Sequence, residues 1–319
     1  MNLIKKSLSV LFFICISNVN AEQACIINKE ISGNVTLNKQ CIYNTSILIT
    51  QSNTTLDCNG ATINASDFKD GITVSSNGKK TNNILIKNCK IDSAQDSAIR
   101  VSWLGPDTKK TNQPDRYLRT PHDISIENVV VTNSGKNGIF LDDFTSNISV
   151  KNSLILGSAA TGIYIEHNSI RNLIMNNTFI GNGFSNGKAK REAIAIDSSE
   201  KNTIAFNTFV RNGLGGVFLY KNCSEKIHSG NQEIRKMHSD FNRIQNNLFK
   251  GEKVGIWLAS RKNKNLEHMD CGDSSIDGLG KFFPDYADNN NVSNNKFISV
   301  ETPIIDNGIN NSITKNNDQ

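Results

Sequence analysis

The stretches ISIENVVV (124–131), ISVKNSLI (148–155) and NLIMNNTF (172–179) decide the fold of this 319-residue chain. Each has an aliphatic residue at its third position, an Asn two residues later and an apolar residue five residues later. We call the aliphatic residues anchors; they are Ile126, Val150 and Ile174, so the repeat is 24 residues long. A unit of this length holds two or three short strands and tight turns, without room for a helix of normal size.

The same pattern continues on both sides of these units, with further anchors at Ile86, Ile204, Ile244 and Val292. The position two after the anchor is Asn in every unit except one, where it is Phe206. Later units add a second Asn (Asn177, Asn207, Asn247 and Asn295) and then a Phe (Phe179, Phe209, Phe249 and Phe297). Stacked units would align these residues into internal columns, with Asn in left-handed turns bonding to the next coil and the Phe rings stacked.

A second motif follows in each unit, a Gly or Ala and then two apolar residues separated by one variable residue. It reads GITV (71–74), AIRV (98–101), GIFL (138–141), GIYI (162–165), AIAI (193–196), GVFL (216–219) and GIWL (255–258). Both motifs predict an all-β solenoid. A β-sandwich is the alternative, but it gives no reason for fixed columns of Asn and Phe.

These repeats resemble the pectate-lyase-like superfamily over about residues 46–316. They are also similar to exported parallel β-helix repeat proteins of unassigned activity. The resemblance implies an all-β fold, a single-stranded right-handed parallel β-helix (solenoid). The superfamily contains polysaccharide lyases, polygalacturonases, mannuronan C-5-epimerases and non-enzymatic β-helices, so the resemblance is specific for fold and not for activity.

The beginning of the chain reads as a signal peptide over residues 1–21, with Lys5 and Lys6, an apolar core at 7–17 and a small-residue cleavage site ending at Ala21. The apolar core is too short to span a bilayer, and no later stretch is long enough. We therefore expect an exported protein, periplasmic or secreted, without a membrane span. Residues 22–53 are expected to form an N-terminal cap region and residues 54–319 the parallel β-helix.

Six cysteines follow the signal peptide, and an even number in an exported chain favours disulfides. Cys58 and Cys89 fall in adjacent columns of adjacent coils, so we predict that they pair. Cys25–Cys41 and Cys223–Cys271 are the hypotheses for the other four, and free buried thiols are the alternative. The net charge of +5, or +3 after removal of Lys5 and Lys6 (5 − 2 = 3), is too small to predict a nucleic-acid partner and is compatible with an anionic polysaccharide.

Spacings longer than 24 residues between anchors mark four insertions, at 103–123, 181–192, 221–241 and 260–290. Three begin directly after a strand of the second motif and one ends just before such a strand. All four should therefore flank the same face of the solenoid. Insertions on one side of a rigid scaffold are a common place for function, so we expect this face to be the floor of a groove.

The residues that alternate outward along the second motif form the floor of this groove. The first outward column reads Thr73, Arg100, Phe140, Tyr164, Ala195, Phe218 and Trp257, and the next reads Ser75, Ser102, Asp142, Glu166, Asp197, Tyr220 and Ala259. Coils about 4.8 Å apart would bring Asp142, Glu166 and Asp197 into a ladder of carboxylates. Such a ladder raises pKa values or binds a cation, and exposed aromatic side chains suit sugar faces.

This floor predicts the binding, and the modification, of an acidic polysaccharide. The carboxylates could hold Ca²⁺ at Asp142, Glu166 and Asp197 while a base removes a proton from a uronate, as in lyases and C-5-epimerases. They could instead serve a polygalacturonase-like glycoside hydrolase, and a non-catalytic glycan-binding or envelope protein is the third possibility. The catalytic candidates are Asp142, Glu166, Asp197, His167, Tyr220, Arg191, Arg261 and His122. The substrate-binding candidates are Arg100, Phe140, Tyr164, Phe218, Trp257, Lys221 and His238.

His122 enters through a resemblance. Thr120-Pro121-His122-Asp123 resembles the D-P-H-D motif of mannuronan C-5-epimerases, whose His takes part in acid–base catalysis. The motif departs from that pattern at Thr120, and no Arg lies between Arg119 and Arg171 to act as the base. A turn leading into the next strand is the alternative interpretation of this tetrapeptide.

Overall fold

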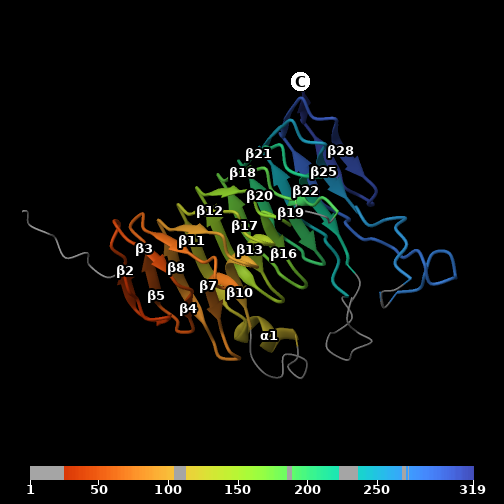
Figure 1. The fold of residues 1–319 in the computed structure, drawn as a ribbon. Helices are drawn as coiled ribbons and strands as arrows, with labels where there is room; N and C mark the ends of the chain where they lie inside the picture. The colour runs from red at the N-terminus through yellow and green to blue at the C-terminus, as the bar shows by residue number, and fades with distance from the viewer. Residues whose placement is uncertain (1–24, 104–112, 185–188, 223–235, 268–270, 272) are drawn as a thin grey trace, which may run out of the picture.

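The computed structural model describes residues 25–103, 113–184, 189–222, 236–267, 271 and 273–319. These residues form a right-handed parallel β-helix, with three parallel ten-stranded sheets that run along its axis (Figure 1). The all-β fold predicted from the repeats is confirmed. The predicted signal peptide (1–21) lies outside the described residues.

Sheet A contains β1 (Glu30–Ile31), β4 (Ile47–Ile49), β7 (Asp70–Ser75), β10 (Ser97–Ser102), β13 (Asn137–Leu141), β16 (Ile163–Ile165), β19 (Glu192–Asp197), β22 (Gly215–Tyr220), β25 (Val254–Leu258) and β28 (Thr302–Asp306). Sheet B contains β2 (Asn34–Thr36), β5 (Thr54–Asp57), β8 (Asn82–Lys87), β11 (His122–Glu127), β14 (Ser146–Lys151), β17 (Leu173–Met175), β20 (Thr203–Ala205), β23 (Arg243–Gln245), β26 (Asn291–Ser293) and β29 (Ser312–Thr314). Sheet C contains β3 (Ile42–Asn44), β6 (Thr62–Asn64), β9 (Lys90–Asp92), β12 (Val130–Thr132), β15 (Leu154–Leu156), β18 (Thr178–Ile180), β21 (Thr208–Val210), β24 (Leu248–Lys250), β27 (Lys296–Ile298) and β30 (Asn317–Asp318).

The expected domain limits need one adjustment at the N-terminal end. Residues 22–53, which the sequence assigned to a cap region, already contain β1 to β4. Strands β1, β2 and β3 pair in parallel with β4, β5 and β6 of the next coil. The regular coils therefore begin before residue 54.

The turn from sheet B to sheet C explains the first Asn column. The residue two after each anchor has a φ between 52° and 57°, in the left-handed region, and this includes Phe206 at 56°. Asn adopts this conformation more readily than other non-glycine residues, because its short polar side chain can bond locally. The turn thus selects Asn at this position for its backbone geometry.

The second Asn column forms a buried ladder along the axis. The Oδ1 atom of Asn247 accepts both the backbone N–H of Asn207, at 2.9 Å, and its side-chain amide, at 3.1 Å. The side-chain amide of Asn247 in turn donates to Asn295 Oδ1 at 3.0 Å and to the carbonyl oxygen of Ile204 at 2.9 Å. Similar ladders run through the other two turns, along Asn172, Asn202, Asn242, Asn290 and Asn311, and along Asn182 and Asn212 to Glu252.

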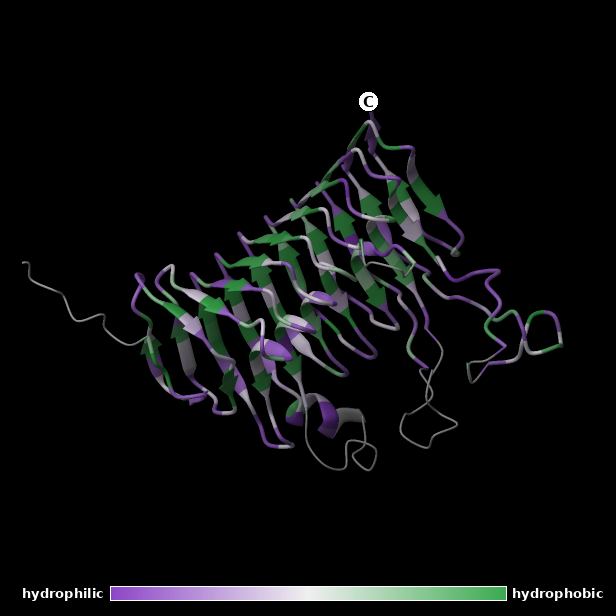
Figure 2. Cartoon of the chain, in the orientation of Figure 1, coloured by the Kyte–Doolittle hydropathy of each residue, from purple (hydrophilic) through white to green (hydrophobic). Residues whose placement is uncertain are grey.

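The interior between the sheets is a single continuous apolar column, seen in Figure 2 as hydrophobic segments repeated from coil to coil. Phe179, Phe209, Phe249 and Phe297 stack with centroid distances of 5.0, 4.6 and 5.0 Å and nearly parallel planes. A Cβ atom at Gly216 would lie 2.4 Å from the ring of Phe249. The Phe column therefore explains why the second motif begins with a very small residue.

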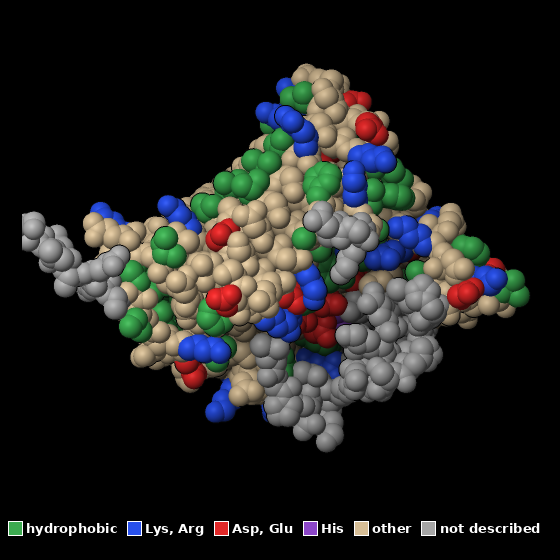
Figure 3. Space-filling model, viewed as in Figure 1, with side chains coloured by type: hydrophobic (Ala, Val, Ile, Leu, Met, Phe, Trp, Pro, Cys, Tyr) green, Lys and Arg blue, Asp and Glu red, His purple; other side chains and the backbone are tan. Residues whose placement is uncertain are grey.

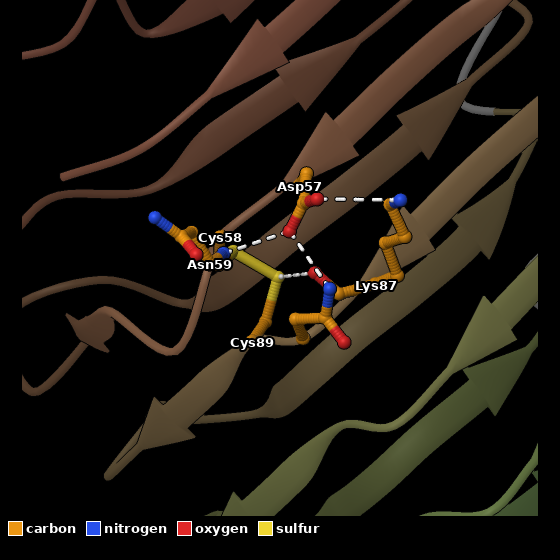
Figure 4. Close-up of a disulfide and its surroundings, with 6 residues drawn as sticks. Asp57, Cys58, Asn59, Lys87 and Cys89 are labelled. Atoms are coloured by element: carbon orange, nitrogen blue, oxygen red, sulfur yellow. Dashed lines mark hydrogen bonds and ion pairs between the residues drawn. A yellow bond between two sulfur atoms is a disulfide. The ribbon is translucent and has the colours of Figure 1, made fainter. Parts of the chain in front are cut away.

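Two disulfides link the first coils, as predicted. Cys25 and Cys41 are bonded, and Cys58 and Cys89 are bonded across neighbouring coils (Figure 4). Asp57, next to the second disulfide, pairs with Lys87 at 3.3 Å. The third predicted pair includes Cys223, which lies outside the described residues; Cys271 is disulfide-bonded.

A substitution in the Asn ladder should lower the free energy of unfolding far more than a substitution in the turn beside it. Asn247→Ala would remove the acceptor of two Asn207 donors and one donor to Ile204, so we expect a loss of about 3 kcal/mol or more in the free energy of unfolding. Asn246→Gly is the matched control, because Gly adopts its φ of 56° freely. Urea unfolding of both variants measures the difference, and equal losses would contradict the ladder's role.

Glu252 should make stability depend on pH. It ends an Asn ladder, is 1 % exposed, and burial raises its pKa from 4.5 to about 7. The folded state keeps a proton that the unfolded state has already lost, so the free energy of unfolding should fall by roughly 3 kcal/mol as the pH rises from about 4.5 to about 7. Glu252→Gln should remove this fall, since one amide oxygen can accept both Asn212 donors as Asn does in other rungs. Melting curves at pH 5 and pH 8 test it, with the exposed Glu301→Gln as control.

Candidate functional site

Sheet A presents the outward column expected from the sequence. Arg100, Phe140, Tyr164, Ala195, Phe218 and Trp257 occupy matched positions in consecutive strands. The guanidinium carbon of Arg100 lies 4.5 Å from the ring centroid of Phe140, and Phe140 and Tyr164 are 5.6 Å apart between centroids. The register between coils therefore produces one row with two aromatic pairs, Phe140–Tyr164 and Phe218–Trp257, separated by Ala195.

The exposure of this row differs from the expectation. Phe140, Tyr164 and Trp257 are half-buried, whereas Phe218 and Tyr220 are each only 2 % exposed. Phe218 packs with Ala195, Tyr220 and Val254 in a small cluster outside the main core. Phe218 is therefore a packing residue beneath the surface, and the predicted direct contact of its ring with a sugar does not fit this burial.

The carboxylate group also differs in one member. Asp142, Asp143 and Glu166 each bring a carboxylate oxygen within 4.8 Å of the others, and we call these three residues the acidic group. The sequence predicted Asp197 as the third member instead of Asp143. Because β13 ends at Leu141, both aspartates lie in the turn that follows, and the next residue, Phe144, has a left-handed φ of 61°. Strand alternation does not apply in such a turn, so Asp143 was missed.

Asp142 bonds to two side chains of the preceding strand of sheet A. It accepts hydrogen bonds from the Ser102 hydroxyl at 2.7 Å and from Arg100 at 3.3 Å. Burial and the adjacent charge of Asp143 raise the pKa of Asp142. Arg100 also pairs with Asp70 and Asp96, at 3.3 and 3.6 Å, and is 9 % exposed. The predicted substrate-binding role of Arg100 would have to compete with these three carboxylates.

Asp197 points into a different network. It is fully buried and accepts hydrogen bonds from the Tyr164 hydroxyl at 2.6 Å, the Ser198 hydroxyl at 2.9 Å and the backbone N–H of Asn222 at 2.8 Å. The sequence predicted that Asp197 would face solvent in a ladder of carboxylates, but in the structure these three donors surround it. Asp197 therefore orients Tyr164 from beneath, and it is Tyr164 that reaches the surface.

Arg191, Glu192 and Tyr220 form a second network next to Tyr164. The Arg191 guanidinium donates to Glu192 at 3.1 Å and to the Tyr220 hydroxyl at 2.9 Å, and its carbon lies 5.9 Å from the Tyr164 ring centroid. The Tyr220 hydroxyl donates to Glu192 at 3.1 Å, and burial raises the pKa of Tyr220. A buried Tyr with a raised pKa is a proton donor and not a base at neutral pH.

Two more cations gather over the same strands. The guanidinium carbon of Arg261 lies 4.7 Å from the Tyr220 ring centroid, and the Lys264 ammonium lies 5.7 Å from that of Trp257. Loss of hydration among neighbouring groups lowers the pKa of Lys264. The positive charges of Arg261 and Arg191 lower it further. We call Arg191, Arg261 and Lys264 the cationic group. Figure 3 shows acidic and basic side chains gathered next to each other on this side of the molecule.

The histidines and Lys221 are held by neighbours. His167 is 4 % exposed, with Nδ1 3.7 Å from Asp143 and its ring 5.6 Å from that of Phe144. His122 lies at the start of β11 in sheet B, and its Nδ1 is 2.9 Å from the carbonyl oxygen of Thr120. Lys221 pairs with Asp273, and His238 stacks on Tyr286 at 4.0 Å.

Part of the first insertion packs beside the acidic group. Helix α1 (Gln113–Arg119) places the Tyr117 ring 5.4 Å from that of Phe144, and the Tyr117 hydroxyl donates to the carbonyl oxygen of Asn168 at 2.7 Å. Asn168 directly follows His167. Figure 1 shows α1 and the 260–290 insertion on the same side of the helix axis. The described parts of these insertions thus flank sheet A, as the spacing of the anchors suggested.

Four residues of this face were not predicted: Asp143, Glu192, Lys264 and Asp285. Glu192 begins β19 and its position next to Arg191 could have indicated an ion pair. Lys264 and Asp285 come from the fourth insertion, which has no repeat. Their positions follow from folding of that insertion against sheet A, and the repeat pattern contains no signal for it.

Comparison with known proteins agrees with the fold. Residues 108–269, about half of the chain, match the sequence model of a family described as "Right handed beta helix region". No curated protein matches at a significant level. In the part of the chain that the structure describes, no helix is long and apolar enough to cross a membrane.

Solved structures similar to this chain include several proteins whose names refer to carbohydrate-acting enzymes or bound oligosaccharides. An alginate lyase from Paenibacillus sp. str. FPU-7 aligns with a TM-score of 0.59 and 12 % identity over 88 % of this chain and 87 % of that one. A GH136 lacto-N-biosidase from Eubacterium ramulus aligns with a TM-score of 0.54 and 15 % identity, over 91 % of this chain and 48 % of that one. A mutant tailspike protein of E. coli bacteriophage HK620, in complex with a pentasaccharide, gives 0.53 and 12 %, over 83 % of this chain and 44 % of that one. At these identities the likeness concerns the fold.

The acidic group generates a prediction about cations. Ca²⁺ prefers oxygen ligands at 2.3–2.6 Å, so carboxylate oxygens within 4.8 Å of one another fit a common ion. We expect millimolar Ca²⁺ to raise the melting temperature of the protein, and Asp143→Asn and Glu166→Gln to remove most of this rise. Calorimetric titration with Ca²⁺ measures the binding, with the exposed Asp318→Asn as control. A rise that both variants retain would place the ion elsewhere.

Proposed function

We propose that this chain, which belongs to the right-handed β-helix family, binds an acidic polysaccharide over sheet A and modifies it as a lyase or a C-5-epimerase. The observation that carries the proposal is the cationic group, whose members lie over the rings of Tyr164, Tyr220 and Trp257. Arg191, Arg261 and Lys264 bring three positive charges to the surface beside Trp257 and Tyr164. A sugar carboxylate is a natural partner for such charges, and the aromatic rings suit the faces of the sugar.

Positive charge beside a uronate carboxylate makes the neighbouring C5 proton more acidic. A base then removes this proton, and in a lyase the electron pair forms a C4–C5 double bond while the C4–O bond breaks. The leaving oxygen must take up a proton. In an epimerase no C–O bond breaks, and a proton returns to C5 from the opposite side.

Tyr164 is the residue we assign to protonation of the leaving oxygen. In this structure its hydroxyl donates its single hydrogen to the buried Asp197 at 2.6 Å, so protonation of the leaving oxygen requires this hydrogen bond to open, while Ser198 and Asn222 continue to donate to Asp197. Lys264 is our candidate base, because the lowered pKa leaves a larger fraction of its amine neutral, and in that state Arg191 and Arg261 remain as the positive charges beside the sugar carboxylate. Lys221, a substrate-binding candidate from the sequence, pairs with Asp273 and is 3 % exposed. Ca²⁺ on the acidic group would supply further positive charge to a neighbouring uronate.

A glycoside hydrolase is the second candidate, favoured by one specific observation. The carboxylate oxygens of Asp142 and Glu166 lie within 4.8 Å of each other on neighbouring coils, close to the separation in retaining enzymes. The raised pKa of Asp142 suits a general acid, and Glu166 would then be the nucleophile. Non-catalytic binding of a glycan is the third outcome that the experiment must separate.

The test is an ultraviolet-absorbance assay on polyuronates, with and without Ca²⁺. A lyase produces an unsaturated uronate that absorbs; a hydrolase produces reducing ends without absorbance; an epimerase changes the C5 configuration, which NMR detects. We expect Tyr164→Phe to lower kcat at least about a hundredfold and to leave KM nearly unchanged, because only the proton donor is lost.

Tyr43→Phe is the matched control, since Tyr43 lies in the first coil, far from sheet A's central strands. Reducing ends that disappear in Asp142→Asn but persist in Tyr164→Phe would favour the hydrolase. Binding without any product would reduce the function to glycan recognition.

A further inference from the structure

Asp285 lies in the fourth insertion and bridges two strands of sheet A. Its Oδ1 accepts the backbone N–H of Lys221 at 2.5 Å, and its Oδ2 accepts that of Arg261 at 2.5 Å. Lys221 directly follows β22, and Arg261 follows β25, the next strand in the sheet. The side chain is 7 % exposed. One carboxylate therefore fixes the points at which two insertions leave the sheet.

The neighbouring residues explain how Asp285 reaches this place. The backbone N–H of Ser239 donates to the carbonyl oxygen of Tyr286 at 3.1 Å, and that of Phe241 donates to Asp288 at 3.3 Å. The Ser239 hydroxyl donates to the carbonyl oxygen of Tyr220 at 2.7 Å. The returning ends of the third and fourth insertions thus run side by side and are attached to sheet A, which sets the position of Asp285.

The site depends on the backbone that Asp285 holds. Lys262 donates its N–H to Ala259, and Lys264 donates its N–H to Arg261, so residues 259–264 form successive turns. A fixed Arg261 backbone therefore also fixes the start of the turn that carries Lys264. Two of the three members of the cationic group depend on this segment.

We propose that Asp285 is a positioning residue of the polysaccharide site: its ionised carboxylate fixes the Arg261 backbone and so holds the cationic group where it receives the carboxylate of an acidic sugar. This inference rests on the proposed function. Asp285 would not touch the substrate; as a buried anion, it would determine where Arg261 and Lys264 lie.

Only the ionised carboxylate can satisfy both N–H groups in full. An Asn offers one oxygen acceptor and turns its NH₂ group toward the other N–H, and a protonated acid keeps only a weaker hydroxyl acceptor at that place. One strand exit would then lose its hydrogen bond and the segment would loosen. Burial raises the pKa of Asp285 to about 7, so this change falls near neutral pH. The charged groups that act on it are Arg261, Asp197 and Lys264, while the Lys221 ammonium pairs with Asp273.

The experiment compares Asp285→Asn with Asp277→Asn in the full chain. Asp277 is the matched control: it lies in the same insertion and accepts the N–H of Leu279 at 3.2 Å, without contacting sheet A. With polyuronate as substrate at pH 8, we expect Asp285→Asn to raise KM at least about tenfold, because Arg261 is misplaced, and to lower kcat as well, because the same segment carries the candidate base Lys264. Asp277→Asn should behave as the wild type.

A pH profile separates positioning from general structural damage. The wild-type KM should rise as the pH falls from 8 to 6, when Asp285 takes up its proton. Asp285→Asn should show a high KM that does not change over this range, although Asp197, Arg261 and Lys264 are all still present. A variant that keeps the wild-type KM, or keeps its pH dependence, would overturn the proposal.

Hydrogen–deuterium exchange gives a second readout that needs no substrate. Peptides covering 219–222 and 258–262 should exchange faster in Asp285→Asn than in Asp277→Asn, and faster in the wild type at pH 6 than at pH 8 after correction for intrinsic rates. If no polyuronate binds to the wild type, the proposed function fails, and exchange alone then decides whether Asp285 holds Arg261. Unchanged exchange would refute that role.

Discussion

From the coil of β17 onward, a buried Asn amide in the turns bonds to the backbone N–H and to the side chain of the Asn in the neighbouring coil, so these coils cannot slip along one another without breaking several buried hydrogen bonds. The stacked Phe rings add an apolar column with the same period. Because both columns fix the register inside the helix, they also fix it outside. The outward row from Arg100 to Trp257 follows from this alignment of the coils.

This rigid register lets the insertions diverge. The acidic group lies on the coils of β13 and β16, and Arg261 and Lys264 follow β25, three strands further along sheet A. With strands about 4.8 Å apart, β25 lies roughly 15 Å along the axis from β16, whereas Arg191 lies beside Tyr164 of β16. A polymer lying along this face would meet opposite charges at its two ends, which gives the groove a direction. Arg100 donates to Asp142, and Glu192 accepts from Arg191. Asp285 accepts the backbone N–H of Arg261.

The repeats predicted the interior well and the surface less well. The Asn turns, the Phe column, the Cys58–Cys89 disulfide and the outward column all follow from periodicity, because each residue of a solenoid has the same environment in every coil. Asp197 and Phe218 show where periodicity stops. Both occupy outward positions, but Phe218 packs with Ala195, Tyr220 and Val254, and Asp197 gains the Tyr164 hydroxyl and the Asn222 N–H as donors. Asp143 shows another limit, since a left-handed turn ends the alternation of the strand.

The sequence by itself determined the parallel β-helix and the face that carries the insertions, because a repeated pattern of buried and turn residues has one way of stacking. Only the tertiary structure decided which outward side chains reach the surface, which carboxylates meet, and that Asp285 lies under Arg261. The physical reason is that the coils repeat their contacts while the insertions do not. A position in the repeat is set by the equivalent residues of the neighbouring coils. Asp285 instead contacts Lys221, 64 residues away, through an insertion that has no repeat.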